Sequence, residues 1–402
     1  MPASSQHRKL TANALDLVPE LPGPRGRLAE EFCLYPDLAL NDPVTLAPYC
    51  RLPDGEWFHY LPDISYAELY RYHTVDAQGR CRRARPFRNA NHEAAVAGFV
   101  CLLDRSASSL RGGNGEEAMK HLGVLLHVLQ DACFGIHALE GPGGCDLFFF
   151  DRLGIGDFSP AELLARVDCP GIPDLSREPR SLGDSVPEAA MRLYARYART
   201  VRAARRTCVA MLAERWSGTG ISPEMALPMY REAVGVCADV LKTALRIAED
   251  RPARGTPTPL AELEPYEFPL GGYGGYRFRS LETDCWHTPD GRRRPLEFPD
   301  ISFASGLSFG LSVSGQNLSY RLAPDCFGHF VGTLLLSGVD RARAHCRVIN
   351  DASAVLKFDL DASSPMRRFE VANPAGTFGI ETESDAPLGV LILGDAMLLP
   401  RP

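Results

Sequence analysis

Residues 121–137 read HLGVLLHVLQDACFGIH, and this stretch predicts a buried helix that also carries chemistry. Its leucines recur at intervals of three and four residues, which indicates one core-facing stripe on a helix over 116–134. His127 and Asp131 lie four residues apart and therefore share an adjoining face. Burying them in an apolar helix is costly unless something compensates their polarity. A metal ion would do so, and a buried His–Asp ion pair is the alternative.

A second metal position follows from His137. A helix that simply continued would turn this residue away from Asp131, but Gly135 offers a helix stop, after which the chain could turn back. Asp131 has two oxygens, so it could join a metal held by His127 to another held by His137. Paired metals suit phosphoester hydrolysis, because they activate a water and clamp the attacking and leaving oxygens.

Five positions of this stretch carry a family resemblance: Gly123, His127, Gln130, Asp131 and His137. Their types and spacing resemble the signature helix of the zinc-dependent phospholipase C superfamily, which also contains single-strand nucleases. The resemblance implies an all-α metal-binding domain that hydrolyses a phosphoester.

Three upstream segments resemble the same family, so that the likeness covers about residues 5–140. They are residues 7–15 (HRKLTANAL), 35–38 (YPDL) and 58–60 (FHY). The resemblance implies one to three zinc ions, and iron or manganese would suit the same donors. Asp37 is the expected catalytic residue, because a carboxylate beside metals can orient or deprotonate water. The implied metal ligands are His7, Asp37, His59, His127, Asp131 and His137.

Alternatives remain within this ligand set. His73 and Asp63 could replace His59 and Asp37, since a Pro-Asp pair occurs in both places. The family's proline within the signature is Gly135 here. The family also places another His and a carboxylate after the last motif His, but this chain has no His between 137 and 287. The candidate oxygen ligands there are Glu140, Asp146 and Asp151.

Three functions stay open at this point. The leading one is hydrolysis of a phospholipid-like or nucleotide-like ester, with a small phosphorylated substrate or a lipid head group as the partner. The second is a degenerate, non-catalytic protein that recognises a glycan or another protein. The third is a metalloenzyme of the same fold that runs other chemistry in a biosynthetic pathway.

The domain organisation follows from patterning along the chain. Residues 1–250 are expected to be α-helical, with long helices at 91–110, 115–134, 186–216 and 222–250. The arginines at 192, 196, 199, 202 and 206 share one helical face, which is expected to meet solvent. A linker is expected at 251–271. Residues 272–402 hold short alternating segments between turns, which predicts an antiparallel, jelly-roll-like β-sandwich.

The C-terminal region also resembles the carbohydrate-binding modules that accompany bacterial glycosidases, on residues 311–324 and 330–333. A glycan is therefore an expected ligand of the β-sandwich. The aromatic side chains that could stack on a sugar are Tyr273, Tyr276, Trp286 and Tyr320, and packing within the core and strands of the sandwich is the alternative for them.

Length and composition limit the possible domain count and function class. A length of 402 residues predicts two domains, and a net charge of −7 argues against a dedicated nucleic-acid binder.

The sequence shows no membrane or secretion segment. No apolar run approaches the roughly 18 residues of a membrane span. The first ten residues lack the apolar core of a secretion signal, which predicts a cytoplasmic protein unless a leader has been removed. The 12 cysteines form no C-x-x-C pair, so no zinc ribbon or redox motif is expected. The sequence does not indicate an oligomeric state.

Overall fold

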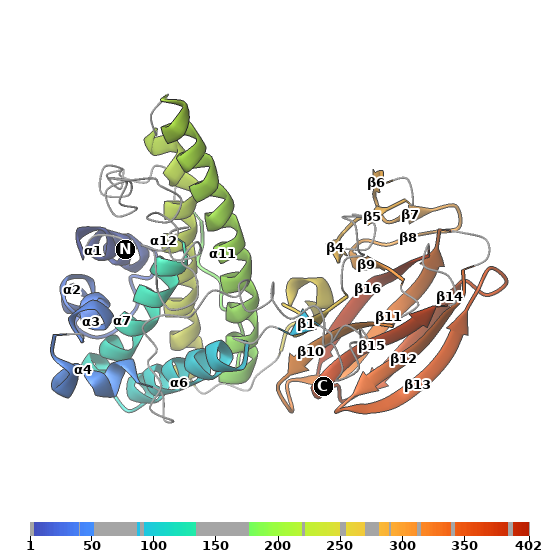
Figure 1. The fold of residues 1–402 in the computed structure, drawn as a ribbon. Helices are drawn as coiled ribbons and strands as arrows, with labels where there is room; N and C mark the ends of the chain where they lie inside the picture. The colour runs from blue at the N-terminus through green and yellow to red at the C-terminus, as the bar shows by residue number, and fades with distance from the viewer. Residues whose placement is uncertain are drawn as a thin grey trace, which may run out of the picture. The chain divides into compact units, whose positions relative to one another are not determined.

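The computed structural model describes twelve stretches of the chain. They are residues 4–39, 41–51, 87–88, 92–133, 177–218, 222–249, 255–269, 281–288, 291–311, 315–338, 342–384 and 389–401. The chain divides into two compact units, one from Met1–Tyr66 and Asn91–Ala253, the other from Ala67–Ala90 and Arg254–Pro402. The first is helical and the second is built of antiparallel sheets, which confirms the predicted fold class (Figure 1).

The described part of the helical unit contains all four long helices that the sequence predicts. Within these stretches no helix combines the length and hydropathy that crossing a membrane would need. The elements are α1 (Ser4–Asp16), α2 (Arg25–Glu30), η1 (Phe32–Leu34), α3 (Tyr35–Leu38), α4 (Pro43–Cys50), α6 (His92–Arg111), α7 (Gly115–Ala132), α11 (Val186–Ser217) and α12 (Pro223–Ala248).

Helix α7 is the buried centre of this unit. It begins at an Asn114 cap, whose side-chain oxygen accepts the amide of Glu117 at 3.2 Å. It packs against α6, α12 and η1 (Figure 1). Apart from the half-buried Lys120, every residue from Ala118 to Ala132 is buried. Polar side chains on α7 therefore need partners inside the protein.

Part of the arginine face of α11 differs from the prediction of a solvent-facing surface, since Arg199, Arg202 and Arg206 are exposed but Arg192 and Arg196 are half-buried. Only 13% of the Arg196 side chain is exposed. Its guanidinium donates to both oxygens of Glu232, at 2.7 and 3.1 Å, and also reaches Asp239. Asp239 additionally binds Arg177 and accepts the amide of Arg180 at 2.8 Å. The carboxylates of α12 thus draw this part of the face into the protein, which helical spacing alone does not reveal.

Two six-stranded antiparallel sheets form the second unit. One has the order β1 (Phe87–Arg88), β3 (Glu267–Phe268), β10 (Gln316–Leu322), β15 (Gly376–Ser384), β12 (Ala344–Asn350), β13 (Ser353–Leu360). The other has the order β14 (Met366–Ala372), β11 (Phe327–Ser337), β16 (Val390–Pro400), β9 (Gly306–Gly310), β4 (Glu282–Thr283), with β2 (Thr258–Pro259) beside β16. Two small hairpins pair β5 (Trp286–His287) with β6 (Arg293–Arg294), and β7 (Glu297–Phe298) with β8 (Ile301–Ser302).

The two sheets face each other through aromatic side chains. Phe330 of β11 meets Phe378 of β15 with ring centroids 4.7 Å apart, and Phe369 of β14 meets Phe358 of β13 at 6.0 Å. The eight strands β9–β16 form one sheet of order 9-16-11-14 and another of order 10-15-12-13. This is the strand order of a jelly roll, as the alternating segments predict.

Four strands of this unit do not follow from the sequence pattern or its predicted boundaries. β15 lies in the middle of its sheet, although glycines and charges interrupt the alternation of its sequence, GTFGIETES. β2 and β3 fall inside the expected linker 251–271, and both pair with long strands, β16 and β10. β1 precedes the long helices in sequence yet pairs with β3. Two-residue strands carry too little periodicity to be found from sequence.

The Asp239 contacts give a test of the helical packing. Asp239→Ala should lower the free energy of unfolding by about 3–5 kcal/mol, because it leaves the buried Arg196 charge with less compensation. Asp104→Ala, at an exposed position of α6, is the control and should change stability by less than about 0.5 kcal/mol. Urea denaturation measures both, and equal stabilities of the two variants would show that the ion pairs contribute nothing.

Candidate metal site

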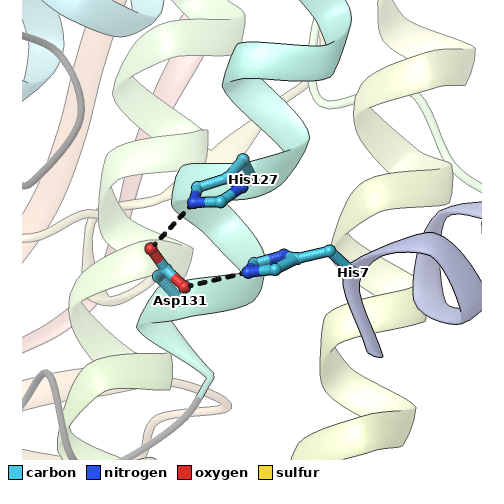
Figure 2. A group of neighbouring side chains, drawn as sticks. All are labelled: His7, His127 and Asp131. Carbon is cyan, nitrogen blue, oxygen red and sulfur yellow. Dashed lines mark ion pairs between the residues drawn. The ribbon is translucent and has the colours of Figure 1, made fainter. Parts of the chain in front are cut away.

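Three polar side chains from two helices converge inside the helical unit. His7 comes from α1, and His127 and Asp131 come from α7 (Figure 2). His7 Nε2 lies 3.4 Å from Asp131 Oδ1, and His127 Nε2 lies 3.3 Å from Asp131 Oδ2. One donor atom from each residue lies within 4.8 Å of the other two. The i, i+4 spacing on α7 therefore produces the shared point that the sequence predicts.

Asp37 joins the group from α3. Its Oδ1 lies 3.6 Å from His127 Nε2, and 19% of its side chain is exposed, against 0% for His127 and 7% for Asp131. Pro36 stands in the first turn of this short helix, a position where its missing amide costs nothing. Asp37 is thus the most accessible of the four side chains.

Each imidazole ring is held by a hydrogen bond at its Nδ1 atom. His127 Nδ1 donates to the main-chain carbonyl of Cys33 at 2.7 Å. His7 Nδ1 donates to the side-chain oxygen of Gln130, also at 2.7 Å. Because each Nδ1 carries the proton, each neutral ring directs the lone pair of its Nε2 towards Asp131. A second hydrogen bond of this kind is typical of metal-bound histidine.

The charges of the site work against protonating both rings. The rings stack with centroids 4.0 Å apart and 12° between their planes. Burial lowers the pKa of His7, and the neighbouring His127 lowers it further. Burial also acts to lower the pKa of His127, but the Asp131 and Asp37 carboxylates outweigh it and raise the pKa of that ring. His7 therefore stays neutral when His127 is charged.

A cation fits this arrangement better than a proton does. With His7 neutral, its Nε2 lone pair faces a carboxylate oxygen, and this buried atom makes no hydrogen bond within the described residues. Two acceptors in contact repel each other unless a positive ion lies between them. His7 Nε2 faces Asp131 Oδ1 and His127 Nε2 faces Asp131 Oδ2, so the two rings meet different oxygens of one carboxylate.

Gly123 brings Cys33 to its place. A Cβ at this position would lie 2.4 Å from the carbonyl oxygen of Phe32 and 2.5 Å from its carbonyl carbon. Glycine thus lets η1 rest directly on α7, one turn before His127. This close approach is made by the short helix η1. The Cys33 carbonyl itself could not be predicted, because every residue carries such a group.

The predicted ligands His59 and His137 lie outside the described residues. So do the alternative ligands, which are His73, Asp63, Glu140, Asp146 and Asp151. The bridge from Asp131 to a metal held by His137 therefore stays a prediction. Within the described stretches, His7, His127 and Asp131 are the one group of three or more such side chains that could hold a metal ion.

The aromatic side chains considered for sugar stacking in the second unit differ in how far they are exposed. Tyr320 is only 1% exposed, because its position on β10 turns the ring into the sandwich, so it cannot stack on a sugar. Trp286 is half-buried and stacks on Phe298 with centroids 5.4 Å apart. Tyr273 and Tyr276 lie outside the described residues. A glycan ligand stays a prediction without an aromatic platform to support it.

Comparison with known proteins gives structural likenesses alone. No family model and no curated protein matches the chain. The α-toxin of Clostridium perfringens is similar at 10% identity and a TM-score of 0.27, over 96% of this chain and 81% of the toxin chain. The CBM51-2 and INT domains of Clostridium perfringens ZmpB, with GlcNAc, match at 14% identity and a TM-score of 0.25, over 36% of this chain.

A further likeness is to the C-terminal CBM6 of LamC from Zobellia galactanivorans, at 14% identity and a TM-score of 0.16, over 29% of this chain and 93% of that chain. The chain spans 31% of the length of the ZmpB structures. These identities and TM-scores do not show a family for this chain.

Gly123→Ala tests how the site is assembled. The new methyl group would press on the Phe32 backbone, which has no flexible end to move aside, so stability should fall by about 1–3 kcal/mol. Gly26→Ala is the matched control, because nothing lies within 4 Å of a Cβ at that helical position. It should be neutral or stabilising by up to about 1 kcal/mol. Thermal denaturation compares the two, and an unchanged midpoint in Gly123→Ala would contradict the close packing of η1 on α7.

Proposed function

We propose that the helical unit is a metal-dependent hydrolase that acts on a phosphoester, with zinc held by His7, His127 and Asp131 and supported by Asp37. The observation that carries the proposal is the meeting of two inward-facing Nε2 atoms at one buried carboxylate. Their Nδ1 partners leave Nε2 as the ligand atom of each neutral ring.

Each residue has a distinct task in this proposal. His7 and His127 are neutral donors, and Asp131 supplies the negative charge that favours a divalent ion. Zinc held there would supply Lewis acidity towards a phosphoryl oxygen. Asp37 stands at the accessible side of the group, where it can orient a water molecule or accept its proton.

The substrate class rests on the sequence. The spacing of Gly123, His127, Gln130, Asp131 and His137 supports a phospholipid-like or nucleotide-like ester, since it resembles helices of zinc phospholipases C and single-strand nucleases. His59 and His137 are the proposed further ligands, which would allow one to three ions. Iron or manganese in place of zinc would use the same donors.

The other candidate functions differ in what they need. A metalloenzyme with other chemistry would keep the same metal ligands and fail on every phosphoester. A glycan-binding protein with a degenerate helical unit would need no metal, and no contact within the described residues of the β unit favours it. Metal content therefore separates the glycan-binding protein from the two metalloenzymes before any substrate is tested.

The metal proposal is tested by elemental analysis of the purified protein and two variants. The wild type should carry at least one zinc per chain, and His127→Ala should lose most of it. His121→Ala is the control on the same helix, because His121 is buried beside Glu117, 3.5 Å away, and is absent from the ligand group. It should keep the wild-type metal content.

Hydrolysis of choline phosphodiesters, mononucleotides and single-stranded nucleic acid is then measured in the same three proteins. The expected pattern is hydrolysis of one class by the wild type and His121→Ala, with loss in His127→Ala. A zinc content in His127→Ala equal to that of the wild type would rule out the proposed metal site. A metal-loaded wild type that hydrolyses none of the three substrate classes would rule out phosphoester hydrolysis.

A further inference from the structure

The buried side chains behind His7 form a hydrogen-bond chain whose direction can be worked out. His7, Thr11 and Gln130 are all 0% exposed, so each polar atom among them must find its partner inside the protein. Gln130 Nε2 donates to the Thr11 hydroxyl at 2.9 Å, while Gln130 Oε1 faces His7 Nδ1 at 2.7 Å. The side chain of Gln130 thus links α1 to α7 through both ends of its amide.

Thr11 gives the chain its direction on the side of α1. Its oxygen accepts from Gln130 Nε2 at 2.9 Å, so Gln130 presents its oxygen to His7 Nδ1.

A second anchor gives Gln130 the same orientation. Its Nε2 also lies 3.7 Å from the sulfur of Cys237 on α12, and that thiol donates to the carbonyl of Leu126 at 3.9 Å. Both hydrogens of the amide are therefore directed at acceptors, and its oxygen is the atom left for His7. A reversed amide would point its oxygen at the Cys237 sulfur, whose hydrogen is directed at Leu126.

We propose that Thr11 is a positioning residue for the metal site, acting through Gln130 to hold His7 in the tautomer that carries its proton on Nδ1. The inference rests on the proposed function, since it assigns Thr11 a role in binding the same metal ion. It also explains why His7 Nε2 faces Asp131 Oδ1 at 3.4 Å as a lone pair.

The consequence of losing Thr11 follows from the same geometry. In Thr11→Val the amide of Gln130 loses its 2.9 Å acceptor and keeps only the longer 3.7 Å contact with the Cys237 sulfur. This weaker contact leaves the amide able to reverse, so that its NH2 group faces His7 Nδ1. The proton of the ring would then move to Nε2 and hydrogen-bond to Asp131. That bond competes with the metal ion for both atoms. Loss of such outer partners typically weakens metal binding by about 10–100-fold.

The test compares Thr11→Val with Thr11→Ser, which keeps the hydroxyl. Nitrogen-15 spectra of the histidine rings in metal-free protein give the tautomer of His7, with His7→Gln identifying its signals. Zinc affinity is measured by competition with a chromophoric chelator. We expect the Nδ1–H form in the wild type and Thr11→Ser, the Nε2–H form in Thr11→Val, and zinc binding at least about tenfold weaker in Thr11→Val alone.

Two results would overturn the proposal. One is an unchanged His7 tautomer in Thr11→Val, and the other is a changed tautomer with zinc affinity equal to the wild type. If Thr11→Val does not fold, Gln130→Glu provides the second variant. Its carboxylate accepts from His7 without needing Thr11, so Thr11→Ala in that background should keep the Nδ1–H form, and loss of that form would equally count against the proposal.

The tautomer is read without metal, which keeps the two proposals distinguishable. A wild type that binds no zinc would remove the proposed function, while its ring spectra would still show whether Thr11 sets the state of His7.

Discussion

The helical unit depends on a single buried carboxylate shared by two histidines. Asp131 directs one oxygen at His7 and the other at His127, at 3.4 and 3.3 Å (Figure 2). Both rings are tied from behind, so neither can turn away from it. Several features of the unit serve this meeting: α7 is buried almost throughout, α1 lies along it, and Gly123 admits η1 to backbone distance.

The same constraint connects stability with chemistry. A lone pair held against a carboxylate is unfavourable in the metal-free protein and becomes favourable once a cation lies between the two. The binding energy of the proposed ion would then also be folding energy, because the ion would join α1 to α7. Asp37 differs from the two histidines in its exposure, because its partly exposed side chain has access to water that His7 and His127 lack. Buried ligands with one accessible carboxylate are a suitable basis for hydrolysis.

Much of this could be predicted from sequence where regular spacing carries the information. The i, i+4 pair of His127 and Asp131, the long helices and most strands of the jelly roll follow from periodicity. Spacing could not show that Arg196 meets carboxylates of a neighbouring helix, or that Tyr320 turns inward. The role of Thr11 depends on the direction of hydrogen bonds between distant segments, which needs atomic positions. β15 was missed because its glycines and charges weaken the alternation.

The most direct measurement of the central claim is a crystal structure of the purified protein with data collected above and below the zinc absorption edge. The account predicts an anomalous difference peak within about 2.0–2.2 Å of His7 Nε2, His127 Nε2 and an Asp131 oxygen. If iron or manganese is bound, the peak appears at that metal's edge and at the same position. Well-ordered His7, His127 and Asp131 with no anomalous peak between them, in protein supplied with zinc, would contradict it.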